Sequence, residues 1–322
     1  MQAILSVTIP FFALVLCGYL AAQRRVLPEA AIPGLNAFVL FFALPCMLFR
    51  FGASMPFAQL INPSLIGVYA LAALVIVFFT VAVTLRRGEG AKGVDMKDAA
   101  FGALVAAFPN TGFMGVPLLV ALLGERAAGP VIGTILVDLF LTSSLCIALA
   151  QASEASHGAL WRSLRGALSN PLPWAIGLGA GLAASGLQLP GPVAQIIKML
   201  GDAATPVALF TIGSVLWRAG QHVHTRTPVP QYLPVALIKL IVHPLAVLSL
   251  GLLLRAAGVP VPEFGLSVLM LAAALPSASN VSLLAERYGA DNGRVARIIM
   301  ASTVLAFVSF SLLAWGLGVQ SG

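Results

Sequence analysis

Residues 106–117 read Ala-Ala-Phe-Pro-Asn-Thr-Gly-Phe-Met-Gly-Val-Pro, and they lie near the middle of an apolar segment at about 97–121. A proline inside a helix removes a backbone hydrogen bond and clashes with the preceding turn. In hydrocarbon, the backbone groups freed in this way need partners in protein or in a water-filled cavity. A second apolar segment, at about 264–287, is interrupted by Ala-Ala-Leu-Pro-Ser-Ala-Ser-Asn-Val at residues 273–281. Two interrupted membrane helices in matching halves of a chain indicate the binding site of a transporter.

The composition places the whole chain in a membrane. Of its 322 residues, 59% are hydrophobic and only 9% are charged, whereas about 25% of the residues of a soluble domain are charged. Apolar runs of about 20 residues recur along the entire length, which predicts an all-α polytopic membrane protein. The net charge of +7 does not indicate nucleic-acid binding, because the basic residues lie in short loops between apolar runs.

The cysteines and motifs exclude several kinds of site. Cys17, Cys46 and Cys146 all lie inside apolar segments, and their number and spacing fit neither a disulfide framework nor a metal site. The chain has no phosphate-binding Gly-x-x-x-x-Gly-Lys-Ser/Thr motif, so we do not expect direct use of ATP, and we expect no cofactor. No basic residue precedes the first apolar run, and a cleaved signal peptide is therefore not expected.

We predict ten transmembrane helices joined by short connections. Polar connections at about 151–168 and 218–230 leave no room for a soluble domain. Prolines at or near the predicted helix ends support these limits. The predicted ranges are 4–22, 33–53, 64–85, 97–121, 130–150, 171–188, 193–217, 231–254, 264–286 and 292–318.

The distribution of Lys and Arg predicts the orientation. With the N-terminus outside, 13 of the 18 Lys and Arg residues fall in inward loops, 4 fall at outward ends, and Lys239 falls inside a helix. Because positive charge is enriched on the cytoplasmic side, this bias predicts that both termini lie outside. We therefore expect a multi-pass protein of a bacterial inner (plasma) membrane with periplasmic termini.

Similarity between the halves of the chain predicts an internal repeat. Ala-Leu-Pro-Cys-Met-Leu-Phe at residues 43–49 resembles Ala-Thr-Pro-Val-Ala-Leu-Phe at residues 204–210, an offset of 161 residues. Pro109 and Pro276, in the two interruptions, are 167 residues apart. The halves 1–160 and 161–322 each hold five predicted helices, so the second half must be inserted upside down. An inverted repeat of five plus five helices is typical of secondary transporters.

Both interrupted stretches resemble a known family. Residues 108–118, Phe-Pro-Asn-Thr-Gly-Phe-Met-Gly-Val-Pro-Leu, resemble the fourth-helix motif of bacterial members of the auxin efflux carrier family. Residues 275–280, followed by Tyr288 and Gly289, are similar to the ninth-helix segment of that family. The second stretch differs from the first in one respect: Ser277 follows its proline, whereas Asn110 follows the proline of the first stretch. The family includes plant auxin carriers, whose long forms have a hydrophilic central loop that this chain lacks, and bacterial transporters labelled as malonate carriers.

The resemblance covers the whole chain and implies an architecture. The first, second, sixth and seventh helices would form a scaffold. The third to fifth and eighth to tenth helices would form a transport domain that moves like an elevator, with the broken fourth and ninth helices crossing inside it. The implied fold is similar to that of the bile-acid–sodium symporters.

Each interruption creates a new helix N-terminus with free N–H groups and a partial positive charge. We expect an anion to bind where the two interruptions cross, beside polar side chains that are natural helix caps. The alternative is a pair of proline kinks whose loose groups are satisfied internally. The predicted substrate-binding residues are Pro109, Asn110, Thr111 and Gly112 in the first interruption and Pro276, Ser277, Ser279 and Asn280 in the second.

Four ionisable residues within the predicted helices are candidates for ion coupling or charge compensation. Asp138 is expected to bind a proton or a sodium ion, or to form a structural ion pair with Lys239. Lys239 is expected to neutralise substrate charge, or to extend its side chain toward the membrane surface. His243 is a proton carrier or a hydrogen-bonded packing residue. Asp202 lines the cavity or has a structural role.

These features predict a secondary transporter of small organic anions, malonate-like di- or monocarboxylates, with H+ or Na+ as the candidate coupling ion. One alternative is a sodium-coupled carrier of larger amphipathic anions, by analogy with the bile-acid fold. Another is a non-transporting membrane receptor, which would not need paired interruptions. An enzyme is not expected, because the chain has no His-Glu-x-x-His or Gly-x-Ser-x-Gly motif. The expected partners are a small carboxylate and the lipid bilayer, with no nucleic acid, and a homodimer is left open.

Overall fold

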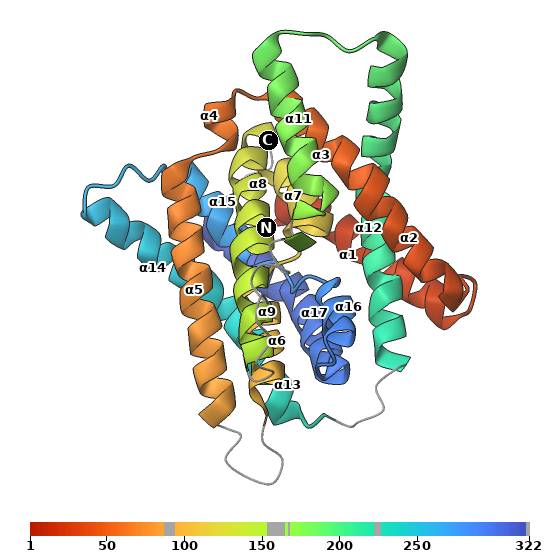
Figure 1. Ribbon diagram of the computed structural model, residues 1–322, viewed down its shortest axis with the longest axis vertical. Helices are drawn as coiled ribbons and strands as arrows, with labels where there is room; N and C mark the ends of the chain where they lie inside the picture. Colours follow the sequence, from red (N-terminus) through yellow and green to blue (C-terminus); the bar gives the residue numbers. More distant parts are fainter. Residues whose placement is uncertain (87–93, 153–164, 167, 222–226, 320–322) are drawn as a thin grey trace.

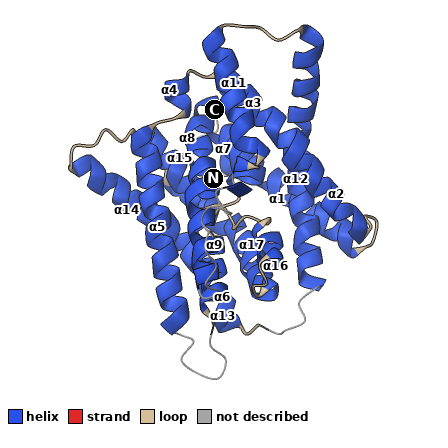
Figure 2. Ribbon diagram, in the orientation of Figure 1, coloured by secondary structure: helices blue, strands red, loops and turns tan. Residues whose placement is uncertain are grey.

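The computed structural model describes residues 1–86, 94–152, 165–166, 168–221 and 227–319. The regular elements of these residues are helices, and several of the long helices run along the long axis of the molecule (Figure 1 and Figure 2). The helices of the first half are α1 (Gln2–Gln23), α2 (Ile32–Phe38), α3 (Leu44–Ser54), α4 (Phe57–Leu60), α5 (Pro63–Arg86), α6 (Met96–Ala107), α7 (Val116–Leu123), α8 (Ala128–Val137) and α9 (Ser143–Gln151). Those of the second half are α11 (Pro171–Ser185), α12 (Gly191–Gln221), α13 (Val229–Leu237), α14 (His243–Ala256), α15 (Glu263–Ala273), α16 (Val281–Arg287) and α17 (Asn292–Gly316).

Short π-helical segments join several of these helices into longer ones. They are η2 (Val39–Ala43) between α2 and α3, η3 (Thr111–Gly115) before α7, η5 (Asp138–Thr142) between α8 and α9, and η7 (Ile238–Val242) between α13 and α14. Single π-helical turns inside α-helices are frequent at functional sites. Two of them contain Asp138 and Lys239, the intramembrane charges singled out in the sequence.

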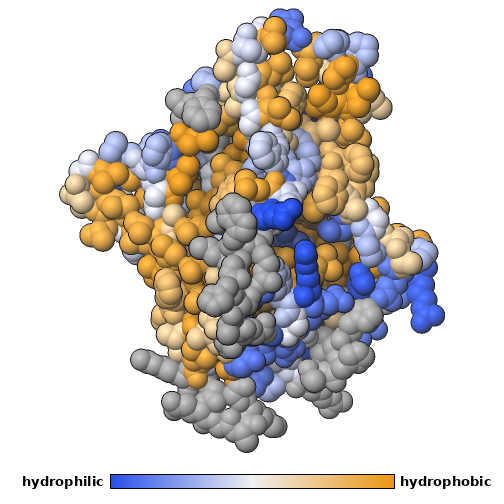
Figure 3. Space-filling view, in the orientation of Figure 1, coloured by the Kyte–Doolittle hydropathy of each residue, from blue (hydrophilic) through white to orange (hydrophobic). Residues whose placement is uncertain are grey.

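The described residues contain seven helices that are long and apolar enough to cross a membrane. Hydrophobic side chains accordingly cover much of the surface in view (Figure 3). The protein is therefore an all-helical polytopic membrane protein, and the sequence prediction is confirmed at that level. The seven are Gln2–Gln23, Glu29–Ser54, Pro63–Leu85, Glu125–Gln151, Gly191–Gln221, Val229–Ala256 and Asn292–Gly316.

Two of the predicted helices are present as separate helical pieces. The range predicted as 97–121 corresponds to α6 and the helical stretch Thr111–Leu123, with the non-helical residues 108–110 between them. The range predicted as 264–286 contains α15 and α16, with residues 274–280 between them. The prolines and small polar residues of both stretches account for these gaps, because they leave backbone groups that an α-helix cannot pair.

Glycines bring two pairs of helices into close contact. A Cβ atom at Gly18 of α1 would collide with the carbonyl oxygen of Phe210 in α12, and one at Gly213 of α12 would collide with that of Val15 in α1. In the same way, α3 and α11 meet at Gly52 and Gly179, where an added Cβ would collide with the facing backbone. Close backbone approach at small residues is a main source of helix association in membranes.

Candidate functional site

The two non-helical stretches, residues 108–110 and 274–280, lie side by side and are called the paired segments below. The backbone N–H of Asn110 donates to the carbonyl oxygen of Pro276 at 2.8 Å, and that of Ala278 donates to the carbonyl oxygen of Phe108 at 3.0 Å. Together these bonds form one antiparallel bridge between Pro109 and Ser277. Much of the backbone polarity that the prolines free from their own helices is thus satisfied across the pair, as an apolar environment requires.

Ser277 anchors the paired segments to the neighbouring helices. Its hydroxyl donates to the carbonyl oxygen of Val105 in α6 at 2.7 Å. Its backbone N–H donates to the hydroxyl oxygen of Ser302 in α17 at 3.2 Å, and the Ser302 hydroxyl donates to that of Ser277 at 3.2 Å. The Ser277 side chain, predicted to bind substrate, is therefore already engaged in bonds that hold the site together.

The side chains expected to cap the new helix starts do not do so. Asn110 precedes the helical stretch Thr111–Leu123 and Asn280 precedes α16, yet neither side chain makes a capping hydrogen bond. This corrects the sequence prediction. At Asn110 the backbone carbonyl oxygen accepts from the N–H groups of Met114 and Gly115 at 3.1 and 2.9 Å, so the first turn is closed by the backbone and not by the side chain. The Thr111 hydroxyl is buried and has no hydrogen-bond partner among the described residues. The Asn110 amide and the Thr111 hydroxyl are thus left available for a ligand.

A small cavity of about 30 Å³ lies against the paired segments. Six of the eight predicted binding residues line it, whereas Pro276 and Ser277 do not. A cavity of this size holds about one water molecule, so a carboxylate substrate would need the surrounding helices to move apart. The lining residues are Leu40, Phe108, Pro109, Asn110, Thr111, Gly112, Phe113, Ile135, Leu139, Asn170, Leu172, Ala278, Ser279 and Asn280.

Of three larger cavities among the described residues, two are lined by helices that continue from the paired segments. The first, of about 490 Å³, lies between α1, α3, α7 and residues 201–205 of α12, and Arg50 and Asp202 are among its lining residues. The second, of about 410 Å³, lies between α2, η2, the end of α12 and α16, and Arg218 and Glu286 are among its lining residues. Since α12 runs from the top of the molecule to its lower part (Figure 1), and the second cavity is lined by Val215, Arg218 and Ala219, the second cavity lies lower along α12 than the first.

Asp138 lies in a fully buried polar cluster. The Tyr69 hydroxyl of α5 donates to its carboxylate at 3.0 Å, and the Thr142 hydroxyl donates at 3.2 Å. The ion pair with Lys239 that the sequence allowed is not among the contacts that the described residues make. Tyr69 was missed in the sequence because a single tyrosine in an apolar run carries no signal of its partner.

Lys239 is fully buried, so its side chain does not extend to the membrane surface as one alternative held. Its ammonium donates to the carbonyl oxygen of Ala273, the last residue of α15, and lies 3.2 Å from Nδ1 of His243. A cation at a helix C-terminus is favoured by the helix dipole. The ring of His243 lies 5.7 Å from that of Tyr69, measured between centroids, and its Nε2 atom is buried with no partner among the described residues. Lys239 thus places a positive charge directly beside the paired segments.

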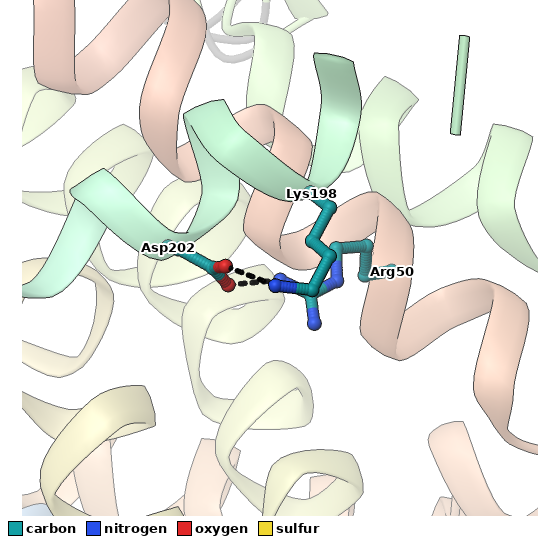
Figure 4. A network of polar contacts seen from close by, with 3 residues as sticks. All are labelled: Arg50, Lys198 and Asp202. Atoms are coloured by element: carbon teal, nitrogen blue, oxygen red, sulfur yellow. Dashed lines mark hydrogen bonds and ion pairs between the residues drawn. The ribbon is translucent and has the colours of Figure 1, made fainter. Parts of the chain in front are cut away.

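Asp202 lies in the first half of α12 and does not line the small cavity. Its carboxylate accepts from Arg50 of α3 at 2.6 Å and from Lys198 at 2.7 Å (Figure 4). All three side chains are about half exposed. Asp202 lines the first cavity, as one of its two predicted roles required, and it also links α3 to α12.

Comparison with known proteins shows which family this chain resembles. Residues 3–314 match the model of the family described as "Membrane transport protein". The chain is 29% identical to a protein of Rhizobium meliloti named "Putative malonate transporter", over 98% of this chain and 96% of the other. It is 24% identical to an uncharacterized transporter of Escherichia coli, over 93% of each chain. It is also 30% identical to auxin efflux carrier component 8 of Arabidopsis thaliana, over 39% of this chain and 34% of the other.

Proposed function

Because the chain belongs to the membrane transport protein family, the family of the auxin efflux carriers, we propose that it is a secondary transporter of small organic anions. The proposed substrates are malonate-like di- or monocarboxylates. The name of the Rhizobium meliloti relative supports this substrate class. The protein is a membrane transporter and not an enzyme.

The observation that carries the proposal is the pairing of two non-helical segments beside polar groups that lack partners. The helical stretch Thr111–Leu123 begins at these segments, and Thr111, Gly112 and Phe113 of its first turn line the small cavity. The N–H of Thr111 already donates to the carbonyl oxygen of Pro109, so the next N–H groups and the positive dipole end of the helix are the ones we propose to meet the anion. The Asn110 amide adds hydrogen-bond donors suited to a carboxylate. The ammonium of Lys239, next to the end of α15, compensates the negative charge of the substrate.

We propose that the carrier works by alternating access of the elevator type, with an inverted repeat of residues 1–160 and 161–322. The close-packed glycines support the repeat, since Gly18 and Gly179 are 161 residues apart, as are Gly52 and Gly213. A shift of 161 residues, the offset of the sequence match, therefore carries the α1 glycine to the α11 glycine and the α3 glycine to the α12 glycine. The α1–α12 contact and the α3–α11 contact are thus equivalent in the proposed repeat. In this proposal α1, α2–α3, α11 and α12 form the scaffold, and the remaining long helices move with the paired segments, which are the crossing of broken helices.

The two large cavities support a path through the protein. Phe41 of η2 lines the second cavity, Leu40 lines the small cavity, and Met47 of α3 lines the first. The cavities therefore follow one another along the same helix, with the narrow point at the paired segments. We propose that the first cavity opens to the outside, together with both termini, in agreement with the excess of Lys and Arg in the opposite loops.

Replacement of Asp138 by asparagine is expected to abolish stimulation of uptake by an ion gradient. Asparagine keeps the size of the side chain and a hydrogen-bond acceptor for Tyr69, but it cannot take up a proton or bind a cation as a carboxylate does. Uptake with and without a pH or sodium gradient measures the effect. Asp95→Asn is the matched control, because Asp95 caps α6 at the end of the helix and asparagine caps equally well. Full gradient stimulation in Asp138→Asn would make Asp138 a structural residue.

Uptake of radiolabelled malonate and related carboxylates into proteoliposomes tests the proposed function. A pH gradient, a sodium gradient and no gradient are compared with empty liposomes and with excess unlabelled substrate. Saturable uptake of a small carboxylate is the expected result. Sodium-dependent uptake of a bile-acid-like anion, with none of any small carboxylate, would replace the substrate class. Binding without transport of either class would instead indicate a receptor.

A further inference from the structure

One arginine lines each of the two large cavities, and each arginine is held by an acidic residue on a neighbouring helix. Arg50 of α3 pairs with Asp202 in the first half of α12. Arg218, near the end of α12, lies 3.4 Å from Glu29, just before α2. The helical span Glu29–Ser54 and α12 therefore each contribute one arginine and one acidic residue to the two pairs. Asp202 and Arg218 are 16 positions apart on α12, which corresponds to about 24 Å along the helix, so the arginines occupy separate sites.

The ion pair at Arg50 can exchange its carboxylate without leaving a charge unpaired. Arg50 binds one carboxylate oxygen of Asp202, and Lys198 binds the other (Figure 4). If a second carboxylate takes the guanidinium of Arg50, Lys198 still holds Asp202. The side chains of Arg50 and Asp202 are 43% and 49% exposed, and exposed ion pairs of this kind contribute only about 0–1 kcal/mol. The planar fork of an arginine, in contrast, suits a carboxylate in a bidentate manner.

Each arginine shares its cavity with a helix that begins at the paired segments. Pro117 and Val120 of α7 line the first cavity together with Arg50, and the helix to which they belong begins at the paired segments. Ser282 and Leu283 of α16 line the second cavity together with Arg218, and α16 begins at the other end of the same pair. Glu125 and Glu286, 161 residues apart, add one further carboxylate to each cavity. Because these carboxylates repel an anion, the arginine is the group in each cavity whose charge can attract one.

We propose that Arg50 and Arg218 are the first residues to bind the carboxylate of the substrate, one in each cavity. Each exchanges its acidic partner for the substrate before the substrate reaches the paired segments. This inference rests on the proposed function of the protein as a carrier of small organic anions. It assigns two binding residues outside the paired segments and predicts that each acts on one side of the membrane.

Side-resolved kinetics test the inference. The apparent KM for the carboxylate is measured for entry from each side, in vesicles of both orientations, for Arg50→Gln, Asp202→Asn and Arg218→Gln. Arg126→Gln is the control, since Arg126 follows Glu125, which lines the first cavity, but packs over the ring of Phe264 and does not itself line that cavity. We expect Arg50→Gln to raise KM about tenfold for entry through the first cavity only, because a charge-assisted bond is lost. Arg218→Gln should do the same through the second cavity only.

The pair Arg50→Gln and Asp202→Asn separates substrate binding from a structural ion pair. If Arg50 receives the substrate, Asp202→Asn removes its competitor and lowers KM on the side where Arg50→Gln raises it. If the ion pair only links α3 to α12, both variants impair transport in the same direction and equally from both sides, and the inference is wrong. Failure of the unaltered protein to carry any carboxylate would overturn the proposed function itself, and this inference with it.

Discussion

Replacement of Asn110 by alanine is expected to lower carboxylate transport at least about tenfold, because a hydrogen bond to a charged group is worth about 1.5–3 kcal/mol. Asn110 is only 4% exposed and lines the small cavity. Its backbone, and not its amide, makes the bonds that hold the paired segments together. Alanine should therefore remove a substrate contact and leave the fold intact. Uptake rates and thermal unfolding of the purified variant measure the two quantities separately.

A second asparagine provides the matched control. The side chain of Asn62 accepts a hydrogen bond from the backbone N–H of Leu65 at 3.1 Å, at the start of α5 and outside the three cavities. Asn62→Ala should reduce the free energy of unfolding by about 0.5–2 kcal/mol, the usual value of a helix cap, and leave transport unchanged. Asn110→Ala should thus lower transport at unchanged stability, whereas Asn62→Ala should lower stability at unchanged transport. Normal transport in Asn110→Ala would place the substrate elsewhere than at the paired segments.

Replacement of Gly213 by leucine is expected to prevent accumulation of folded protein. A Cβ atom alone at this position would lie 2.6 Å from the backbone nitrogen of Tyr19, and it would also collide with the carbonyl oxygen of Val15. Overpacking a side chain that can move aside costs about 1–3 kcal/mol. Here the obstacle is the backbone of α1, so the helices must separate and the loss is larger. Total stability is only about 5–15 kcal/mol, so little folded protein should remain.

The yield of monodisperse protein in size-exclusion chromatography measures this effect. Gly177→Leu in α11 is the control, because nothing lies within 4 Å of a Cβ atom at that position, and leucine forms helices better than glycine. Gly52→Leu should fail in the same manner as Gly213→Leu, because its Cβ atom would meet the backbone of α11. Normal yield of Gly213→Leu would show that α1 and α12 do not pack as described.

The limits of the helices were largely predictable from the sequence. The range predicted as 64–85 is α5, Pro63–Arg86, and the range predicted as 292–318 is α17, Asn292–Gly316. Both helices consist of an apolar run that ends at local start and stop signals, so the hydropathy of the sequence is enough to find them. The roles of individual polar residues were not predictable in the same way. Asn110 was expected to cap a helix and does not; its backbone N–H instead pairs with Pro276 of the other half of the chain, a contact that no local pattern indicates.

By itself, the sequence determined that this is an all-helical membrane protein of the auxin efflux carrier family, and which stretches carry polar groups inside apolar segments. These properties depend on the order of residues along the chain, because hydropathy, helix breaking by proline and a family motif are local. Only the tertiary structure decided that Asp138 is bound by Tyr69, that Lys239 binds the end of α15, and that Asp202 is held between Arg50 and Lys198. Most of these pairs join residues far apart in sequence. A buried polar group must find a partner among the helices that surround it, and the packing of those helices sets which partner is in reach.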